Sequence, residues 1–247
     1  MRGYSVSGAA PPPAWPDELA ALDAAWEGGD AVGPEEALAQ LAVWRQRLGR
    51  PEQPGEERLD VVSAVGEPLG WAAPRWFCHL TGLRHRVIHC FLTTPQNLLL
   101  LQMRSHDKAE WPSLFDTSVG GHVKAGQGWR QGALNEIEEE IGLPASQVSH
   151  WLEGGRLVEA GPAYERYGVG QVNQGSDLLM RNRQVNQIFG GQLTDWGLSR
   201  LHFQDGELAG VFLCRPEEAR RMWETDFLIA PGLRHAFWRW WEWRAGG

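Results

Sequence analysis

Paired cysteines, long apolar runs and an excess of positive charge are all absent from this chain of 247 residues. Its three cysteines, Cys78, Cys90 and Cys214, have neither disulfide-type nor metal-type spacing, so we expect reduced and buried thiols. No uncharged run approaches the roughly 20 residues that span a bilayer. No basic region followed by an apolar run indicates a signal peptide. We therefore expect a cytoplasmic protein with no membrane partner.

The shortage of positive charge excludes a second class of protein. Lysine and arginine number 23 against 31 aspartates and glutamates, which leaves a net charge of −8 at pH 7. No global field therefore attracts a nucleic-acid polymer. An acidic protein that acts on phosphates would need a metal ion to offset the repulsion. The hydrophobic content of 43% is ordinary for a globular protein with a sizeable core.

Proline and glycine divide the chain into three parts. We expect residues 1–50 to form a tail and a helical extension, with helices over 17–26 and 34–48. The second helix has an apolar face of Leu38, Leu41, Trp44 and Leu48. Residues 51–230 form the main domain. Residues 231–247 form a helix that packs on that domain or on the partner in a homodimer, because its four tryptophans do not all fit one stripe.

The main domain interleaves strands with helices, which predicts a layered α/β sandwich. We expect a hairpin from 84–93 and 98–104, because both segments are apolar and a TPQN turn separates them. The segment from Arg58 to Gly82 is strand-like and 161–182 is irregular. Further strands are expected near 156–160, 184–193 and 207–215, and a helix over 216–223.

The stretch from Gly120 to Leu143 carries the main chemical signal. A glycine-rich turn leads into a helix on which Glu136, Glu139 and Glu140 stand at positions i, i+3 and i+4, so their carboxylates converge within about one turn. Like charges at this spacing repel, which indicates a missing divalent cation. A run of glutamates is also typical of a solvated helix face, and the glycine spacing decides between these interpretations.

From Gly121 onward the stretch keeps the spacing of the Nudix box: glycine, five residues, glutamate, seven residues, then Arg-Glu-apolar-any-Glu-Glu-any-Gly-apolar. The matching positions are Gly121, Glu136, Ile137, Glu139, Glu140, Gly142 and Leu143. Two positions depart, since Gln127 stands for the first glutamate and Asn135 for the arginine. The chain thus resembles the Nudix hydrolases. Segments between about 58 and 225 also resemble the branch related to isopentenyl-diphosphate isomerase.

The resemblance implies a mixed sheet between helices and a metal-dependent hydrolase for a small-molecule diphosphate, such as a nucleoside diphosphate derivative. Glu136, Glu139 and Glu140 would be the catalytic and metal-binding residues for Mg²⁺ or Mn²⁺, with the carbonyl of Gly121 as a further ligand. One metal would polarise the phosphoryl oxygen and lower the pKa of the attacking water. The expected substrate-binding residues are Arg86, Arg104 and His122.

Departures from the family pattern bear on two other functions. In the isomerases a cysteine stands at the position of Gly120, and two carboxylates at those of Asn182 and Gln184. His85 and His122 match histidines that bind the isomerase metal, but without the carboxylates the hydrolase is favoured. The changes at Gln127 and Asn135 motivate a third possibility, a Nudix-like binding module with weakened catalysis. Weaker candidates are base stacking on Trp111 or Trp129 and an acidic role for Glu207.

Overall fold

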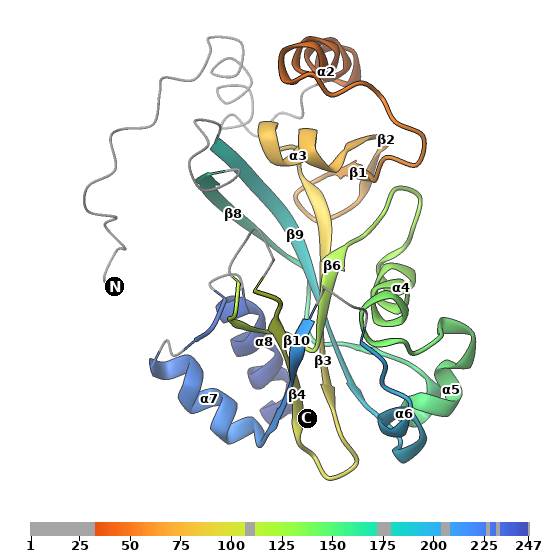
Figure 1. The fold of residues 1–247 in the computed structure, drawn as a ribbon, viewed down its shortest axis with the longest axis vertical. Helices are drawn as coiled ribbons and strands as arrows, with labels where there is room; N and C mark the ends of the chain where they lie inside the picture. Colours follow the sequence, from red (N-terminus) through yellow and green to blue (C-terminus); the bar gives the residue numbers. More distant parts are fainter. Residues whose placement is uncertain are drawn as a thin grey trace.

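A mixed sheet of eight strands lies at the centre of the computed structural model, which describes residues 33–106, 112–171, 179–203, 208–225, 228–230 and 233–246. Its main path runs β10, β4, β3, β9, β7, and β5, β6 and β8 pair with β4, β3 and β9 (Figure 1). Strands β3 and β9 are parallel, and the other pairs are antiparallel. The strands are β3 (His85–Thr93), β4 (Leu99–Arg104), β5 (Phe115–Asp116), β6 (Val119–His122), β7 (Val158–Glu159), β8 (Tyr164–Gln171), β9 (Leu179–Gln192) and β10 (Leu208–Cys214).

Helices cover both faces of this sheet, as the sandwich prediction requires (Figure 1). Alternation along β3 sends Ile88 and Leu92 to one face and Phe91 to the other. The first face packs against α4 (Trp129–Ile141), α5 (Val148–Trp151) and α6 (Asp195–Ser199). The second packs against α7 (Pro216–Thr225) and α8 (Leu233–Gly246), where Phe237 stacks on Trp223 at 4.3 Å between ring centroids. The mixed α/β sandwich is therefore confirmed.

A separate apolar cluster forms at one end of the sheet. It joins helix α2 (Pro34–Leu48), the two-stranded sheet of β1 (Arg58–Val62) and β2 (Pro68–Pro74), and helix α3 (Arg75–Thr81). This layer lies beside the upper ends of β3 and β9 in Figure 1. It places β1 and α3 next to the start of β3, and residues of all three elements line a polar cavity at this end of the sheet.

The helix expected over 34–48 is confirmed with those bounds. Proline opens it, two glutamates lie in its first turn, and Gly49 closes it in the left-handed conformation with φ 60°. Its buried face contains Leu41 and Trp44, but Leu38 is 48% exposed, so the expected apolar face is wrong at that position. The helix expected over 17–26 lies outside the described residues.

Two segments differ from the expectation drawn from sequence. The strand-like reading of the region up to Gly82 is wrong for 75–81, which form α3 after Pro74. The prediction of irregular structure over 161–182 is wrong for 164–171 and for 179–182, because β8 pairs along its whole length with β9, which begins at Leu179. Strand β8 has little alternation of its own, so its pairing with a distant strand decides its conformation. None of the helices in the described part of the chain combines the length and apolar character needed to cross a bilayer.

Candidate active site

Three of the four glutamates of α4 face a cavity of about 840 Å³ at the end of the sheet that carries α3. Ile137 and Ile141, on the adjoining side of the same helix, are fully buried and fix its rotation against the sheet. Glu136, Glu139 and Glu140 consequently line the cavity together. The helix ends at Gly142 with φ 72°, so the glutamates occupy its last two turns.

Strand β6 brings the glycine backbone against these carboxylates. A Cβ atom on Gly121 would lie 2.2 Å from Oε2 of Glu136, so only glycine leaves room for that carboxylate. The amide of Gly120 donates a hydrogen bond to Oε2 of Glu140 at 3.4 Å. Mg²⁺ and Mn²⁺ prefer oxygen ligands, and the carboxylates of α4 together with the main-chain carbonyl of Gly121 could supply them.

The cavity is acidic in spite of several basic side chains. Six carboxylates line it against four lysine and arginine side chains. Three of these cations are paired within the cavity: Lys124 with Glu139 at 2.5 Å, Arg104 with Asp116 at 2.9 Å, and Arg75 with Glu57 at 3.0 Å. A diphosphate would meet net negative charge here, so a bound divalent cation fits the residues present.

Burial and the excess of negative charge in the cavity both change the pKa of Glu136. Burial, and then the charge of Glu139, raise the pKa of Glu136 to about 7. Lys124 acts in the opposite direction but does not cancel these effects. A divalent cation beside the carboxylate would favour its ionised form.

As the pH rises from 5 to 8, we expect Glu136 to contribute less to the stability of the metal-free protein, whereas His79, His85 and His122, whose pKa values burial lowers, act in the opposite direction. The folded state has the higher pKa at Glu136, so the stability that the protonated form contributes is complete below the ordinary value near 4.5 and is lost as the pH passes about 7. Thermal unfolding in a chelating buffer measures this, and Mn²⁺ should raise the midpoint more at pH 8 than at pH 5. Because the histidines affect both proteins alike, the midpoint of the wild type relative to that of Glu136→Gln should fall between pH 5 and 8. A difference between the two midpoints that stays constant over this range would contradict this account.

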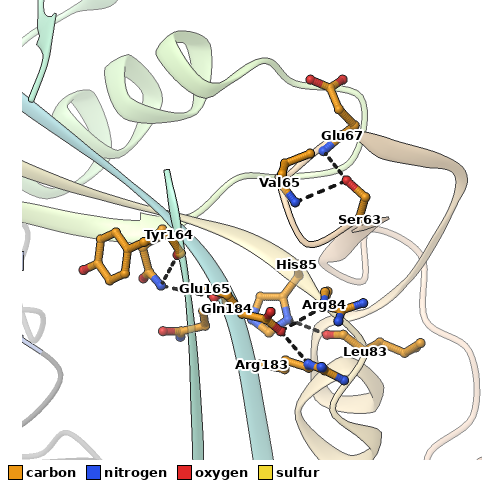
Figure 2. A network of polar contacts seen from close by, with 11 residues as sticks. Ser63, Val65, Glu67, Leu83, Arg84, His85, Tyr164, Glu165, Arg183 and Gln184 are labelled. Carbon is orange, nitrogen blue, oxygen red and sulfur yellow. Dashed lines mark hydrogen bonds and ion pairs between the residues drawn. The ribbon is translucent and has the colours of Figure 1, made fainter. Parts of the chain in front are cut away.

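A second group of possible metal ligands lies in the same region. His79 of α3, His85 of β3 and His122 of β6 each offer a ring nitrogen, and these atoms lie within 4.8 Å of one another. The Nε2 atoms of His79 and His122 are 3.0 Å apart. Nδ1 of His85 donates to the carbonyl of Leu83 at 2.9 Å, as Figure 2 shows, which leaves a lone pair on a buried Nε2 that has no hydrogen-bond partner.

All three histidines are neutral near pH 7. Burial lowers the pKa of His79 to about 2 and that of His85 to about 4, and it holds the pKa of His122 well below its usual range. Neutral imidazole is the form that binds metals. The sequence indicates His85 and His122 only through their match to the isomerase metal ligands. It gives no signal for His79, because a strand-like interpretation of 75–81 does not bring this residue to the site.

The expected substrate ligands are placed differently from one another. Arg104 and His122 line the cavity. Arg86 does not, because its guanidinium is buried in an ion pair with Asp60 at 2.7 Å and donates to the carbonyl of Gln127 at 2.7 Å. The expectation that Arg86 binds substrate is therefore replaced by a contact with the loop before α4. Trp111 and Glu207 lie outside the described residues.

The residues that depart from the family patterns fall into two groups, those that line the cavity and those in the box, in or just before α4. Gly120, Asn182 and Gln184 line the cavity, and Oδ1 of Asn182 is buried without a hydrogen-bond partner. Gln127 and Asn135 do not contact each other through a hydrogen bond in the described part of the chain. Oδ1 of Asn135 accepts from Gln131 at 2.7 Å, and Oε1 of Gln127 is buried and unpaired.

Comparison with known proteins identifies the family. The family model of the NUDIX domain matches residues 83–231, which is more than half of the chain. The chain belongs to the Nudix family. Nudix proteins are generally metal-dependent pyrophosphate hydrolases, so the acidic Nudix cavity is the expected place for chemistry.

Curated relatives share the Nudix region. Nudix hydrolase 3 of Arabidopsis thaliana is 43% identical over 90 residues, which cover 36% of this chain and 12% of that protein. An uncharacterized Nudix hydrolase of Listeria innocua is 37% identical over 108 residues, covering 43% and 63%. Isopentenyl-diphosphate delta-isomerase 2 of Homo sapiens is 32% identical over 108 residues, covering 38% and 47%. The chain thus spans less than two thirds of the length of these relatives.

Among solved structures, a crystal structure of a Deinococcus radiodurans protein aligns with this Nudix chain at a TM-score of 0.49 and 20% identity. The alignment covers 74% of this chain and 98% of the other.

Proposed function

We propose that this chain is a Nudix hydrolase that cleaves a diphosphate linkage in a small molecule, such as a nucleoside diphosphate derivative, with Mg²⁺ or Mn²⁺. The observation that carries the proposal is the convergence of Glu136, Glu139 and Glu140 with Gly121 on one acidic cavity. Bound metal would supply polarisation of the phosphoryl oxygen and a more acidic attacking water. Hard divalent cations suit this all-oxygen set of ligands.

The chain's own residues take the remaining tasks. Glu140 accepts the proton that the attacking water loses, because its carboxylate lines the cavity. The hydrogen bond from the amide of Gly120 orients this carboxylate. Arg75 and Arg104 offer guanidinium donors to the phosphates. Arg75 is the more available of the two, because its side chain is 48% exposed against 23% for Arg104.

The test is turnover of a panel of nucleoside diphosphate derivatives and other small diphosphates, with Mg²⁺ or Mn²⁺ over a range of concentrations. We expect metal-dependent release of a phosphate-containing product from at least one class of compound. Absence of product from every class, at every metal concentration, argues against the proposal.

A Nudix-like binding module is the second candidate, favoured by one observation. Gln127 has a buried and unpaired Oε1 where the family has a glutamate, so that part of the box is not held as in its relatives. A pure binding module would retain a diphosphate compound in calorimetry but release no product in the panel. Isomerisation of a prenyl diphosphate is less favoured, because Gly120, Asn182 and Gln184 replace the groups that the isomerases use. Isomerase activity of the wild type would reverse that order.

We also propose that His79, His85 and His122 can hold a transition metal such as Zn²⁺. Three neutral imidazoles without a carboxylate suit Zn²⁺ and similar ions far better than Mg²⁺. The buried and unpaired Nε2 of His85 supports this, because a lone pair of that kind is costly unless something binds it.

We expect the wild type to retain Zn²⁺ after dialysis and His79→Gln to bind it more than about tenfold more weakly. His150→Gln is the matched control, since His150 is exposed and contacts the ring of Trp196 instead. Metal content by atomic emission, with titration against a chromogenic chelator, gives the affinities. Equal retention of zinc by His79→Gln and wild type would remove the histidines as a zinc site.

A cytoplasmic location and a homodimer are two further proposals. Three buried, reduced cysteines are compatible with the cytoplasm. Trp243, at the end of α8, is 37% exposed while Trp240 on the same helix is 2% exposed, and this exposed ring is where a homodimer contact is expected.

A further inference from the structure

Strand β1 lies before the matched Nudix region, yet it holds the loop that connects the two halves of the candidate metal site. Gly121 belongs to β6, and the three glutamates belong to α4. Residues 123–128 join these elements. Any movement of this loop would change the distance between the glycine backbone and the carboxylates.

One ion pair ties β1, β3 and this loop together. Oδ2 of Asp60 accepts from Nη2 of Arg86 at 2.7 Å and also from the amide of Gly126 at 2.9 Å. The same Nη2 donates to the carbonyl of Gln127 at 2.7 Å. Two side chains thus clamp two peptide groups of the loop, the one between residues 125 and 126 and the one between residues 127 and 128.

Packing and backbone contacts reinforce the clamp. The guanidinium of Arg86 lies over the ring of Trp129, the first residue of α4, at 5.4 Å from its centroid. Gly66, in the turn after β1, packs closely against the same ring, because a Cβ at this position would lie only 2.6 Å from it. The amide of Ala125 donates to the carbonyl of Arg58 at 2.8 Å.

The clamp occurs where the chain departs from its family. In the Nudix pattern the first glutamate and the arginine help to orient the metal ligands, whereas here Gln127 and Asn135 make no hydrogen bond with each other. Asp60 and Arg86 are buried to 15% and 5% side-chain exposure, so their charge pair is strongly held. Neither residue lines the cavity, so both act through the loop.

We propose that Asp60 and Arg86 are positioning residues that set the geometry of the metal site by fixing the loop between β6 and α4, in place of the pair that Gln127 and Asn135 have lost. The functional unit therefore begins at β1 and not at the start of the matched region. This inference rests on the proposed metal-dependent function. It requires that the ligands be misplaced, not removed, when the clamp is broken.

The experiment measures Mn²⁺ binding by electron paramagnetic resonance, with the full chain and no substrate. We expect Asp60→Ala to weaken Mn²⁺ binding about 10- to 100-fold, in the range found for residues that orient metal ligands. Asp60→Asn keeps an acceptor for Gly126 but loses the charge opposite Arg86, so its affinity should lie between those of Asp60→Ala and wild type. This second variant keeps the test valid if Asp60→Ala does not fold.

Glu165→Gln is the matched control, because Glu165 also binds two cationic side chains, Arg84 and Arg183 (Figure 2). No hydrogen bond or ion pair in the described part of the chain joins Glu165 to the loop. This variant should leave Mn²⁺ affinity within about twofold of wild type even if its unfolding midpoint falls. Wild-type affinity in folded Asp60→Ala or Asp60→Asn would show a merely structural pair and overturn the inference. A wild type that binds no Mn²⁺ overturns both proposals, whereas one that binds Mn²⁺ but hydrolyses nothing overturns the reaction alone.

Discussion

Glu140→Gln should lower kcat for the best diphosphate substrate by about 10²- to 10⁴-fold, the range for loss of a positioned general base. The amide cannot accept the proton of the attacking water and is a weaker ligand for a hard cation. The fold should persist, because the substitution removes one of the four carboxylates that repel one another on α4. Steady-state kinetics with saturating Mg²⁺ or Mn²⁺ measure the change, and circular dichroism checks the fold.

Glu138→Gln is the control for this prediction. Glu138 stands on the same helix but is exposed and points away from the cavity, where one of its oxygens accepts from the amide of Ala145 at 3.1 Å. Its kcat should stay within about twofold of wild type, as for a surface substitution. If both variants lose activity equally, net charge on α4 matters and the specific role of Glu140 is wrong.

Gly121→Ala should also abolish most of the activity, although it adds only one methyl group. The new Cβ would lie 2.2 Å from Oε2 of Glu136, and α4 cannot retreat because Ile137 and Ile141 are packed in the core. The carboxylate must rotate out of place, and a displacement of about 1 Å in an active site can cost about 10²-fold. We expect a loss of kcat of at least that size and weaker Mn²⁺ binding.

Gly128→Ala separates this effect from a general cost of replacing glycine in the box. Gly128 precedes α4 with φ −81°, and a Cβ there meets nothing within 4 Å. This variant should keep wild-type kinetics and Mn²⁺ affinity. Normal activity in Gly121→Ala would mean that the carboxylate of Glu136 is free to move, and its role as a fixed ligand would have to be abandoned.

Local patterns predicted much of this fold. The helix over 34–48 carries its own start and stop signals, and the hairpin of β3 and β4 is apolar with a clear turn between its strands. The sheet between helices followed from the interleaving of such segments and from the Nudix resemblance. Local patterns did not predict strand β8 or helix α3. Strand β8 depends on pairing with β9, and α3 is a short helix whose aromatic and polar residues have no helical periodicity.

The sequence by itself determined which three glutamates can bind one metal ion. Their spacing on one helix is a local property, and the glycine pattern before them specifies the turn that faces them. Only the tertiary structure decided the rest of the site. His79, His85 and His122 come together from α3, β3 and β6, and Asp60 meets Arg86 from a strand outside the matched region. Contacts between residues far apart in the chain depend on sheet pairing and packing, which no local spacing records.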